Sequence, residues 1–168
     1  MTTTTTTKKT TTTSKTQQKR VKLPPNPFIH EVFELVVKQR TRQDKINILK
    51  EYEDPSIKAI FIWNFDESVI SVIPDGPVPY KENEVPVGTD HTSLRREYKN
   101  LYHFVRGGND TLSSLRKETM FIQLLEGLHP KEAEIVCLIK DKKLTSKYKI
   151  SHDLVKEAYP DIVWGNRS

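Results

Sequence analysis

Hydrophobic residues recur at helical spacing in the first ordered stretch of this chain. They occupy the positions i, i+3, i+4, i+7 and i+8, which lie on one face of an α-helix: Ile29, Val32, Phe33, Val36 and Val37. The preceding residues, Asn26 and Pro27, are typical of the entry to a helix. The pattern therefore predicts an amphipathic helix over residues 29–37.

Two further helices are predicted before residue 66. The second begins at Thr41, with Asp44 three positions later in an arrangement that resembles a capping box. The third begins after Asp54 and Pro55, an N-cap residue followed by a proline at the first helical position. This helix is apolar on nearly every side, and a helix of that kind is expected at the centre of a fold. Its apolar residues are Ile57, Ile60, Phe61, Ile62, Trp63 and Phe65.

The second half of the chain contains the clearest helical pattern. Residues 93–105 predict one helix, with Leu94, Tyr98, Leu101 and Val105 as its buried stripe. Two apolar runs, 112–126 and 130–140, meet at the turn 127–130 and predict a helical hairpin, and a last helix is predicted from about Ser151 to Pro160. We expect the hairpin to form the core, so that Leu124→Ala would cost ~2–5 kcal/mol of stability.

Residues 66–91 interrupt the helical pattern with four prolines and two glycines. Such a composition excludes a continuous helix and predicts a long loop, either packed across the helices or available to a partner. The fold class predicted is all-α: a compact bundle of six to seven helices with a long Pro-rich loop and a disordered N-terminal arm. The arm and its proline spacer cover residues 1–27, and a single domain covers residues 28–168.

Charge separates the arm from the domain. Residues 1–22 contain eleven threonines and six cations but no acid, whereas residues 23–168 contain 21 basic and 22 acidic side chains. The arm cannot bury apolar surface and is predicted to be disordered. It is either a solubilising leader or a basic arm that neutralises phosphates of a nucleic acid. Its cations are Lys8, Lys9, Lys15, Lys19, Arg20 and Lys22.

Two groups of side chains in the domain are candidates for binding nucleic acid or another partner. The first is a line of helical spacing that combines three cations with one aromatic ring: Arg95, Lys99, Tyr102 and Arg106. The second is a lysine cluster that begins with Lys140, Lys142 and Lys143. Each group can equally be the solvated outer face of a helix, because outer faces are usually charged.

Catalytic and metal-binding patterns are missing from the sequence. The five histidines and Cys137 show no metal-ligand spacing, and neither a phosphate-binding loop nor a nucleophile motif is present. Glu132 and Glu134 lie two positions apart and are expected on solvated faces, not in an acid/base pair. His129 is expected to be a turn residue or the N-cap of the helix that begins at Pro130. The sequence predicts no catalytic residue, cofactor, metal site or membrane span.

Several short segments resemble a family of small proteins carried by tailed phages of the T-even type, including phages of marine cyanobacteria. The segments are YHFV at 102–105, GGN at 107–109, MFIQLLEGLH at 120–129, EAE at 132–134, KDKKL at 140–144, VKEAY at 155–159 and PYKENE at 79–84. The resemblance covers about residues 28–164 and excludes the Thr-rich arm. It implies a viral protein in the cytoplasm of an infected bacterium and transfers no site residue, because the family has no assigned activity.

Together these features favour a non-enzymatic accessory protein that binds nucleic acid or a protein of the replication or transcription machinery. The alternative is a minor structural component of the virion, or another protein–protein interaction component, in which the Pro-rich loop and exposed aromatic residues form the contact.

Overall fold

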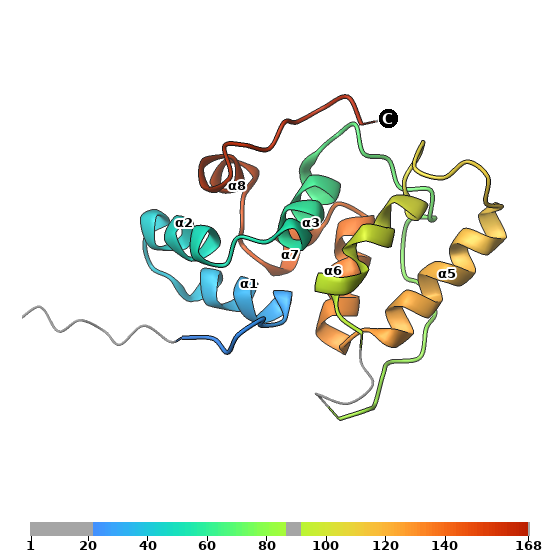
Figure 1. Ribbon diagram of the computed structural model, residues 1–168, viewed down its shortest axis with the longest axis horizontal. Coiled ribbons are helices and arrows are strands. Elements are labelled where there is room, and N and C mark those ends of the chain that lie inside the picture. The colour runs from blue at the N-terminus through green and yellow to red at the C-terminus, as the bar shows by residue number, and fades with distance from the viewer. Residues whose placement is uncertain (1–21, 87–91, 168) are drawn as a thin grey trace, which may run out of the picture.

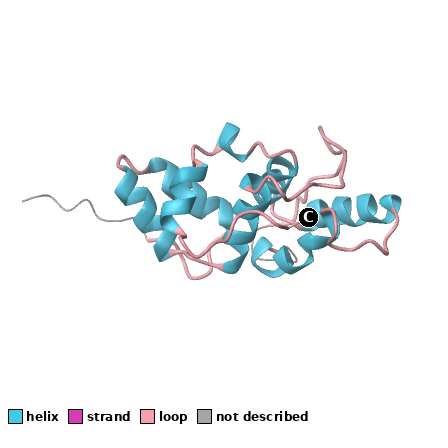
Figure 2. Cartoon of the chain, turned by 90° about the horizontal axis from the view of Figure 1, so that it is seen from above, coloured by secondary structure: helices cyan, strands magenta, loops and turns pink. Residues whose placement is uncertain are grey.

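The computed structural model describes residues 22–86 and 92–167, and within these ranges the chain is all-α, as the sequence predicts (Figures 1 and 2). The predictions for Lys8, Lys9, Lys15, Lys19 and Arg20 lie outside the described residues. The elements are α1 (Ile29–Lys38), α2 (Arg42–Glu51), α3 (Pro55–Phe65), α4 (Leu94–Glu97), the 3₁₀-helix η1 (Tyr98–Phe104), α5 (Ser114–Gly127), α6 (Pro130–Lys140), α7 (Leu144–Lys147) and α8 (His152–Ala158).

Helices α3 and α6 pack against each other at the centre of the molecule. Helices α1, α2 and α8 lie on one side of this pair, and η1 and α5 lie on the other (Figure 1). The central position of α3 follows from its apolar surface, which α6, α4 and η1 cover from different directions. The hairpin α5–α6 is therefore divided between the centre and the edge of the fold.

The sequence indicates N-caps at Thr41, Asp54 and His129, and these caps are present. Thr41 accepts a hydrogen bond from the N–H of Asp44, and Asp54 accepts one from the N–H of Ser56. Ser151 caps α8, and the Nδ1 atom of His129 accepts a hydrogen bond from the N–H of Lys131. Each cap satisfies a backbone N–H group that has no partner within its own helix.

Glu132 is buried, so the prediction of a solvated side chain at this position is wrong. Its Oε2 atom accepts a hydrogen bond from the N–H of Ile29, and its Oε1 atom accepts one from the N–H of Leu94, both at 3.1 Å. Burial raises the pKa of this carboxyl, while the two N–H groups and Arg95 act in the opposite direction. One side chain on α6 thus caps the first turns of both α1 and α4.

The single helix predicted over residues 93–105 is instead a short α-helix, α4, followed by the 3₁₀-helix η1. Glu132 holds the N-terminal end of this segment, and an antiparallel bridge between Ser71 and Val105 holds the other end. A 3₁₀-helix rises about 2.0 Å per residue against about 1.5 Å for an α-helix, so it spans more distance with the same residues. The two fixed ends account for the extended form.

The described part of the Pro-rich loop packs against the helices. Val78 and Tyr80 contact the core, and the buried ammonium of Lys140 donates hydrogen bonds to the carbonyl oxygens of Pro74 and Gly76. Asp141 pairs with the same ammonium. Of the two interpretations of the loop, packing across the helices is therefore confirmed for residues 66–80, whereas most of residues 81–86 are exposed and residues 87–91 lie outside the described residues.

His30 is buried where α1 meets the turn between α5 and α6. Its ring stacks on His129 with 4.7 Å between the ring centroids, and its Nδ1 atom has no hydrogen-bond partner among the described residues. The pKa of His30 is lowered to about 4, mainly by burial and by the neighbouring His129. The ammonium groups of Lys131 and Lys147 act in the same direction, and Glu34 acts in the opposite direction. The folded protein therefore contains this imidazole in its neutral form.

Stability is expected to fall in mild acid because of His30. Its pKa is lower in the folded state than its ordinary value of 6.5, so the unfolded chain binds the proton more tightly. The contribution of the neutral His30 imidazole to the free energy of unfolding is present above pH 6.5 and decreases toward pH 4. It falls by on the order of 2 kcal/mol between pH 7 and pH 5. Urea unfolding at both pH values measures it. The variant His30→Phe keeps an aromatic ring there and should lose most of this difference; an equal pH dependence in both proteins would contradict the assignment.

Candidate functional site

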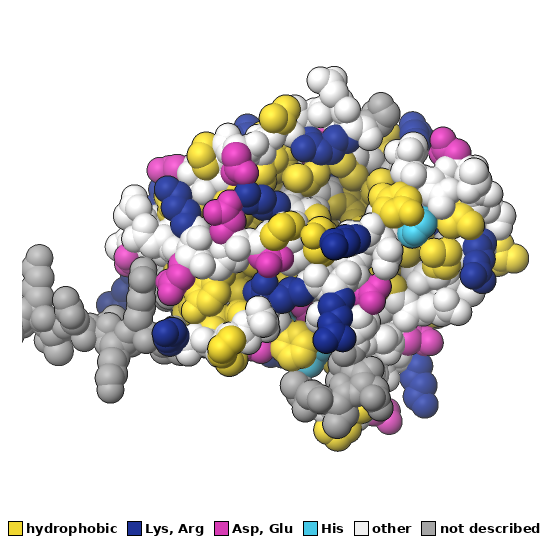
Figure 3. All heavy atoms as spheres, viewed as in Figure 1, with side chains coloured by type: hydrophobic (Ala, Val, Ile, Leu, Met, Phe, Trp, Pro, Cys, Tyr) yellow, Lys and Arg dark blue, Asp and Glu magenta, His cyan; other side chains and the backbone are white. Residues whose placement is uncertain are grey.

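An elongated hollow lies between α3, η1 and the C-terminal segment, and we call it the aromatic groove. Its volume is about 400 Å³, and its walls are mainly apolar. A hollow lined by hydrophobic side chains, with cations at its edge, is visible on this face of the molecule (Figure 3). The lining residues are Ala59, Ile62, Trp63, Val69, Tyr98, Leu101, Tyr102, Val105, Arg106, Gly107, Gly108 and Arg167. Grooves of this size and composition are typical of ligand sites.

The aromatic side chains of the groove differ in how firmly they are held. Trp63 is 3% exposed, and its Nε1 atom donates a hydrogen bond of 2.7 Å to Ser71. Ser71 in turn donates to the carbonyl oxygen of Lys140, so the indole is fixed in the floor. Tyr102, in contrast, is 48% exposed at the edge of the groove. A fixed apolar floor beside an exposed ring suits the stacking of a flat group.

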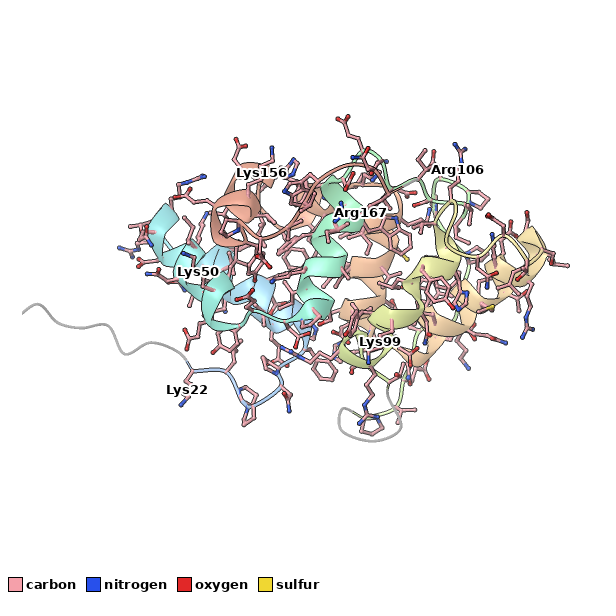
Figure 4. The ribbon with its side chains drawn as sticks, turned by 45° about the horizontal axis from the view of Figure 1, so that its top comes forward. Lys22, Lys50, Lys99, Arg106, Lys156 and Arg167 are labelled. Carbon is pink, nitrogen blue, oxygen red and sulfur yellow. The ribbon has the colours of Figure 1, made fainter. Side chains whose placement is uncertain are left out.

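Two arginines border the groove, and the fold positions each differently. The backbone N–H of Arg106 donates to the carbonyl oxygen of Ile70, which fixes the start of its side chain. Its guanidinium makes no hydrogen bond or ion pair within the described ranges. Figure 4 shows Arg106, Arg167 and Lys99 in the half of the molecule that contains the groove, whereas Lys50 and Lys156 lie in the other half.

Arg167 is tied to the groove by Asp66. Its Nη1 atom lies 2.5 Å from Oδ2 of Asp66, which also accepts a hydrogen bond from the N–H of Gly165. Burial raises the pKa of Asp66, but hydrogen bonds from Ser68, Gly165 and Arg167 outweigh burial and lower the pKa to about 2. Asp66 is therefore ionised at neutral pH and keeps Arg167 at the border of the groove.

The pair Gly107-Gly108 shapes one end of the groove. Gly107 has a φ of +80°, and a Cβ atom on Gly108 would lie 1.8 Å from the carbonyl oxygen of Tyr102. Both positions therefore require glycine for the chain to turn back against Tyr102 after η1. The pair follows the end of η1, and Ser113 supplies the N-cap of α5.

The candidate line of four residues is divided by the structure. Tyr102 and Arg106 border the groove, and Lys99 is exposed nearby with its ammonium 5.9 Å from the ring centroid of Tyr98. Arg95 is engaged internally: its Nε atom donates to the carbonyl oxygen of Pro27, and its guanidinium pairs with Asp54. Arg95 therefore joins α4 to the start of α3.

The lysine cluster is mostly committed to internal contacts. Lys140 is buried beneath the Pro-rich loop, and Lys142 donates hydrogen bonds to the carbonyl oxygens of Trp63 and Asp66. Burial lowers the pKa of Lys142. Lys143 is exposed, as is Lys22 at the end of the N-terminal arm. The cluster thus offers fewer available cations than its sequence suggests.

Three of the aromatic and cationic residues that line the groove were not among the sequence candidates. Trp63 and Tyr98 were assigned only to buried faces. Trp63 lies on a helix that is apolar on nearly every side, and an aromatic residue on such a helix can also form a groove wall. Arg167 lies near the C-terminus without any surrounding pattern, and only the fold brings it to Asp66, 101 positions away. No local signal could have identified it.

The described residues contain neither a group of three or more His, Cys, Asp and Glu side chains that could hold a metal ion nor a helix suited in length and hydrophobicity to cross a membrane.

One comparison with known proteins gives a match. The model of a family of unknown function, DUF6433, matches residues 32–146, which is more than half of the chain and includes most of the groove. No curated protein and no solved structure matches the chain.

Proposed function

The chain belongs to the DUF6433 family of unknown function, and we propose that it is a non-enzymatic phage accessory protein that binds single-stranded nucleic acid in the aromatic groove. The observation that carries this proposal is the combination of apolar and aromatic walls with Arg106 and Arg167 at the border of one hollow. The resemblance to T-even-type phage proteins supports a role in the cytoplasm of an infected bacterium.

The groove offers both contacts that a single strand requires. Bases stack on aromatic rings with little dependence on sequence, each stacking contact being worth about 1–3 kcal/mol. Tyr102 is the exposed ring, and the buried indole of Trp63 lines the same groove. Arg106 and Arg167 line the groove, and the ammonium of Lys99 lies 5.9 Å from the ring centroid of Tyr98, another lining residue, so these cations can contact the phosphates that flank a stacked base.

The N-terminal arm supplies charge that the domain lacks. The domain has one more acid than base, whereas residues 1–22 carry six cations. We therefore propose that the groove positions the strand and that the arm adds attraction that does not depend on sequence. A protein of the replication or transcription machinery is the partner class that remains if no nucleic acid binds.

Groove variants should weaken binding without unfolding the protein. For a labelled single-stranded oligonucleotide, we expect Tyr102→Ala to raise Kd about tenfold, because one stacking contact is lost. Arg106→Gln should raise Kd and reduce the slope of log K against log salt by about 0.7, the value for one phosphate contact on a single strand. Fluorescence anisotropy at several salt concentrations measures both quantities.

Lys50→Gln and Lys156→Gln are matched controls, because both lysines are exposed and lie away from the groove. They should change Kd by less than about twofold. If Lys50→Gln and Lys156→Gln weakened binding as much as Arg106→Gln, and Tyr102→Ala had no effect, the interaction would reflect charge alone and the groove would be excluded as the site.

Deleting residues 1–22 tests the arm in the same assay. The deletion should leave binding detectable at low salt and reduce the salt slope by up to about four, because each of six cations can contribute about 0.7. An unchanged slope would remove the arm from the proposal.

The alternative function is that of a minor virion component. Leu115 favours it, because this residue is 74% exposed on α5, the helix at the edge of the fold. Mass spectrometry of purified particles would find the chain at a fixed stoichiometry if this alternative holds.

A further inference from the structure

A second hollow lies on the opposite side of η1 from the aromatic groove, between η1 and α5, and we call it the polar groove. Its volume is also about 400 Å³, but polar side chains form much of its wall. In Figure 1, η1 is the yellow-green helix between α3 and α5, so the two grooves flank it. The polar side chains are Thr92, Glu97, Asn100, His103 and Gln123.

Two adjacent rings connect the grooves. Tyr102 lines the aromatic groove and His103 lines the polar groove, and their ring centroids are 4.0 Å apart. The Nδ1 atom of His103 lies 3.0 Å from Nδ2 of Asn109, which holds the imidazole in place. A strand with one base in the aromatic groove can therefore cross these rings and place a neighbouring base in the polar groove.

The carboxylate of Glu97 sets the chemistry of the polar groove. Its Oε1 atom accepts a hydrogen bond of 2.7 Å from the hydroxyl of Thr92, and its Oε2 atom accepts one of 3.2 Å from the amide of Asn100. An ionised carboxylate offers about four acceptor positions, so two remain. Gln123 makes no hydrogen bond to the described part of the chain and can add a donor and an acceptor.

We propose that the polar groove recognises the edge of a base and selects bases with an exocyclic amino group over uracil and thymine. This inference rests on the proposed function. Cytosine, adenine and guanine carry such an amino group, and a carboxylate accepts a hydrogen bond from it. Uracil and thymine present a carbonyl oxygen at the corresponding position of cytosine's amino group. Two acceptors would then face each other, and the carboxylate would lose water without gaining a donor.

Oligodeoxycytidine and oligodeoxyuridine of equal length test this selection. The two strands carry the same charge and rings of the same size, so stacking and phosphate contacts should be about equal, and the main difference is the amino group. For the full chain at neutral pH, fluorescence anisotropy should give a Kd about tenfold lower for oligodeoxycytidine, the effect of one hydrogen bond to a charged group.

Glu97→Gln should reduce this difference to less than about twofold, because an amide can accept from cytosine or donate to uracil. The amide oxygen can still accept from Thr92, so the groove should keep its shape, which circular dichroism and the unfolding midpoint would check. Asp153→Asn makes the same change of charge at an exposed position on α8 and should keep the preference intact.

Three outcomes would overturn the inference. Equal affinity for both strands in the unaltered protein would exclude base selection while leaving strand binding in place. A preference that survives Glu97→Gln would exclude Glu97 as its source. If neither strand binds at low salt, the proposed function fails, and base selection fails with it.

Discussion

Glu132→Ala is expected to lower the free energy of unfolding by about 3 kcal/mol. The substitution removes the acceptor of two buried N–H groups, those of Ile29 and Leu94. A hydrogen bond to a charged group contributes about 1.5–3 kcal/mol, and an unpaired buried donor carries its full desolvation cost. The substitution also removes the cost of burying the carboxylate, the same burial that raises its pKa, and this gain offsets part of the loss. Urea unfolding at neutral pH measures the difference.

Glu134→Ala is the matched control, because it removes a carboxylate two positions along the same helix. Glu134 pairs with Lys147, and both side chains are more than 40% exposed, so the cost should be below about 1 kcal/mol. Glu132→Gln should give an intermediate loss, since one amide oxygen can accept from only one helix while the amide nitrogen faces the other donor. Equal losses for Glu132→Ala and Glu134→Ala would contradict the double-cap role.

Phe121→Ala is expected to cost about 3–5 kcal/mol, the usual range for a phenylalanine removed from a core. Phe121 is fully buried and meets Phe104 edge to face, with 5.2 Å between the ring centroids. This contact joins α5 to η1, so the substitution leaves a cavity between an edge helix and the segment that forms both grooves. The variant should also bind single strands more weakly, because η1 loses its support.

Leu124→Ala provides the comparison on the same helix. Leu124 is only half-buried and lines the polar groove, so we expect a cost of about 1 kcal/mol. The sequence pattern placed Leu124 in the core with a cost of ~2–5 kcal/mol. Unfolding midpoints for both variants distinguish the two views: similar losses would support the sequence-based assignment, and a loss concentrated in Phe121→Ala would support the structure.

Features that depend on neighbouring residues could be predicted from the sequence. The caps at Thr41, Asp54 and His129 each involve a backbone group two or three positions away. The apolar surface of α3 likewise indicated its central place without knowledge of its neighbours. In each case the physical cause lies within one or two helical turns.

Features that depend on distant residues could not be predicted. Glu132 contacts Ile29 and Leu94, which lie 103 and 38 positions away in the sequence. Lys140 contacts the carbonyl oxygens of Pro74 and Gly76, which lie 66 and 64 positions away. Both side chains are charged, and a charged side chain on a helix is usually solvated. The backbone groups that these two side chains bind belong to distant segments, which come close only in the folded structure.

The candidate site likewise combines residues that local spacing indicates with residues that only the fold brings together. Helical spacing grouped Tyr102 with Arg106, and both line the aromatic groove, although Arg106 follows η1 and is held there by the hydrogen bond from its N–H to the carbonyl oxygen of Ile70. The same pattern included Arg95, which the fold uses to join α4 to Asp54. Arg167 completes the border from the far end of the chain, through a contact with Asp66 that no periodicity encodes.

The double cap by Glu132 also bears on the order in which the protein folds during synthesis. Helix α1 leaves the ribosome about one hundred residues before the carboxylate that satisfies its first N–H group. The hydroxyl of Tyr159 likewise donates to the carbonyl oxygen of Leu49, 110 positions earlier. The first three helices therefore lack these partners until residue 159 has been translated. We expect them to reach their final packing only after α6 and α8 have left the ribosome.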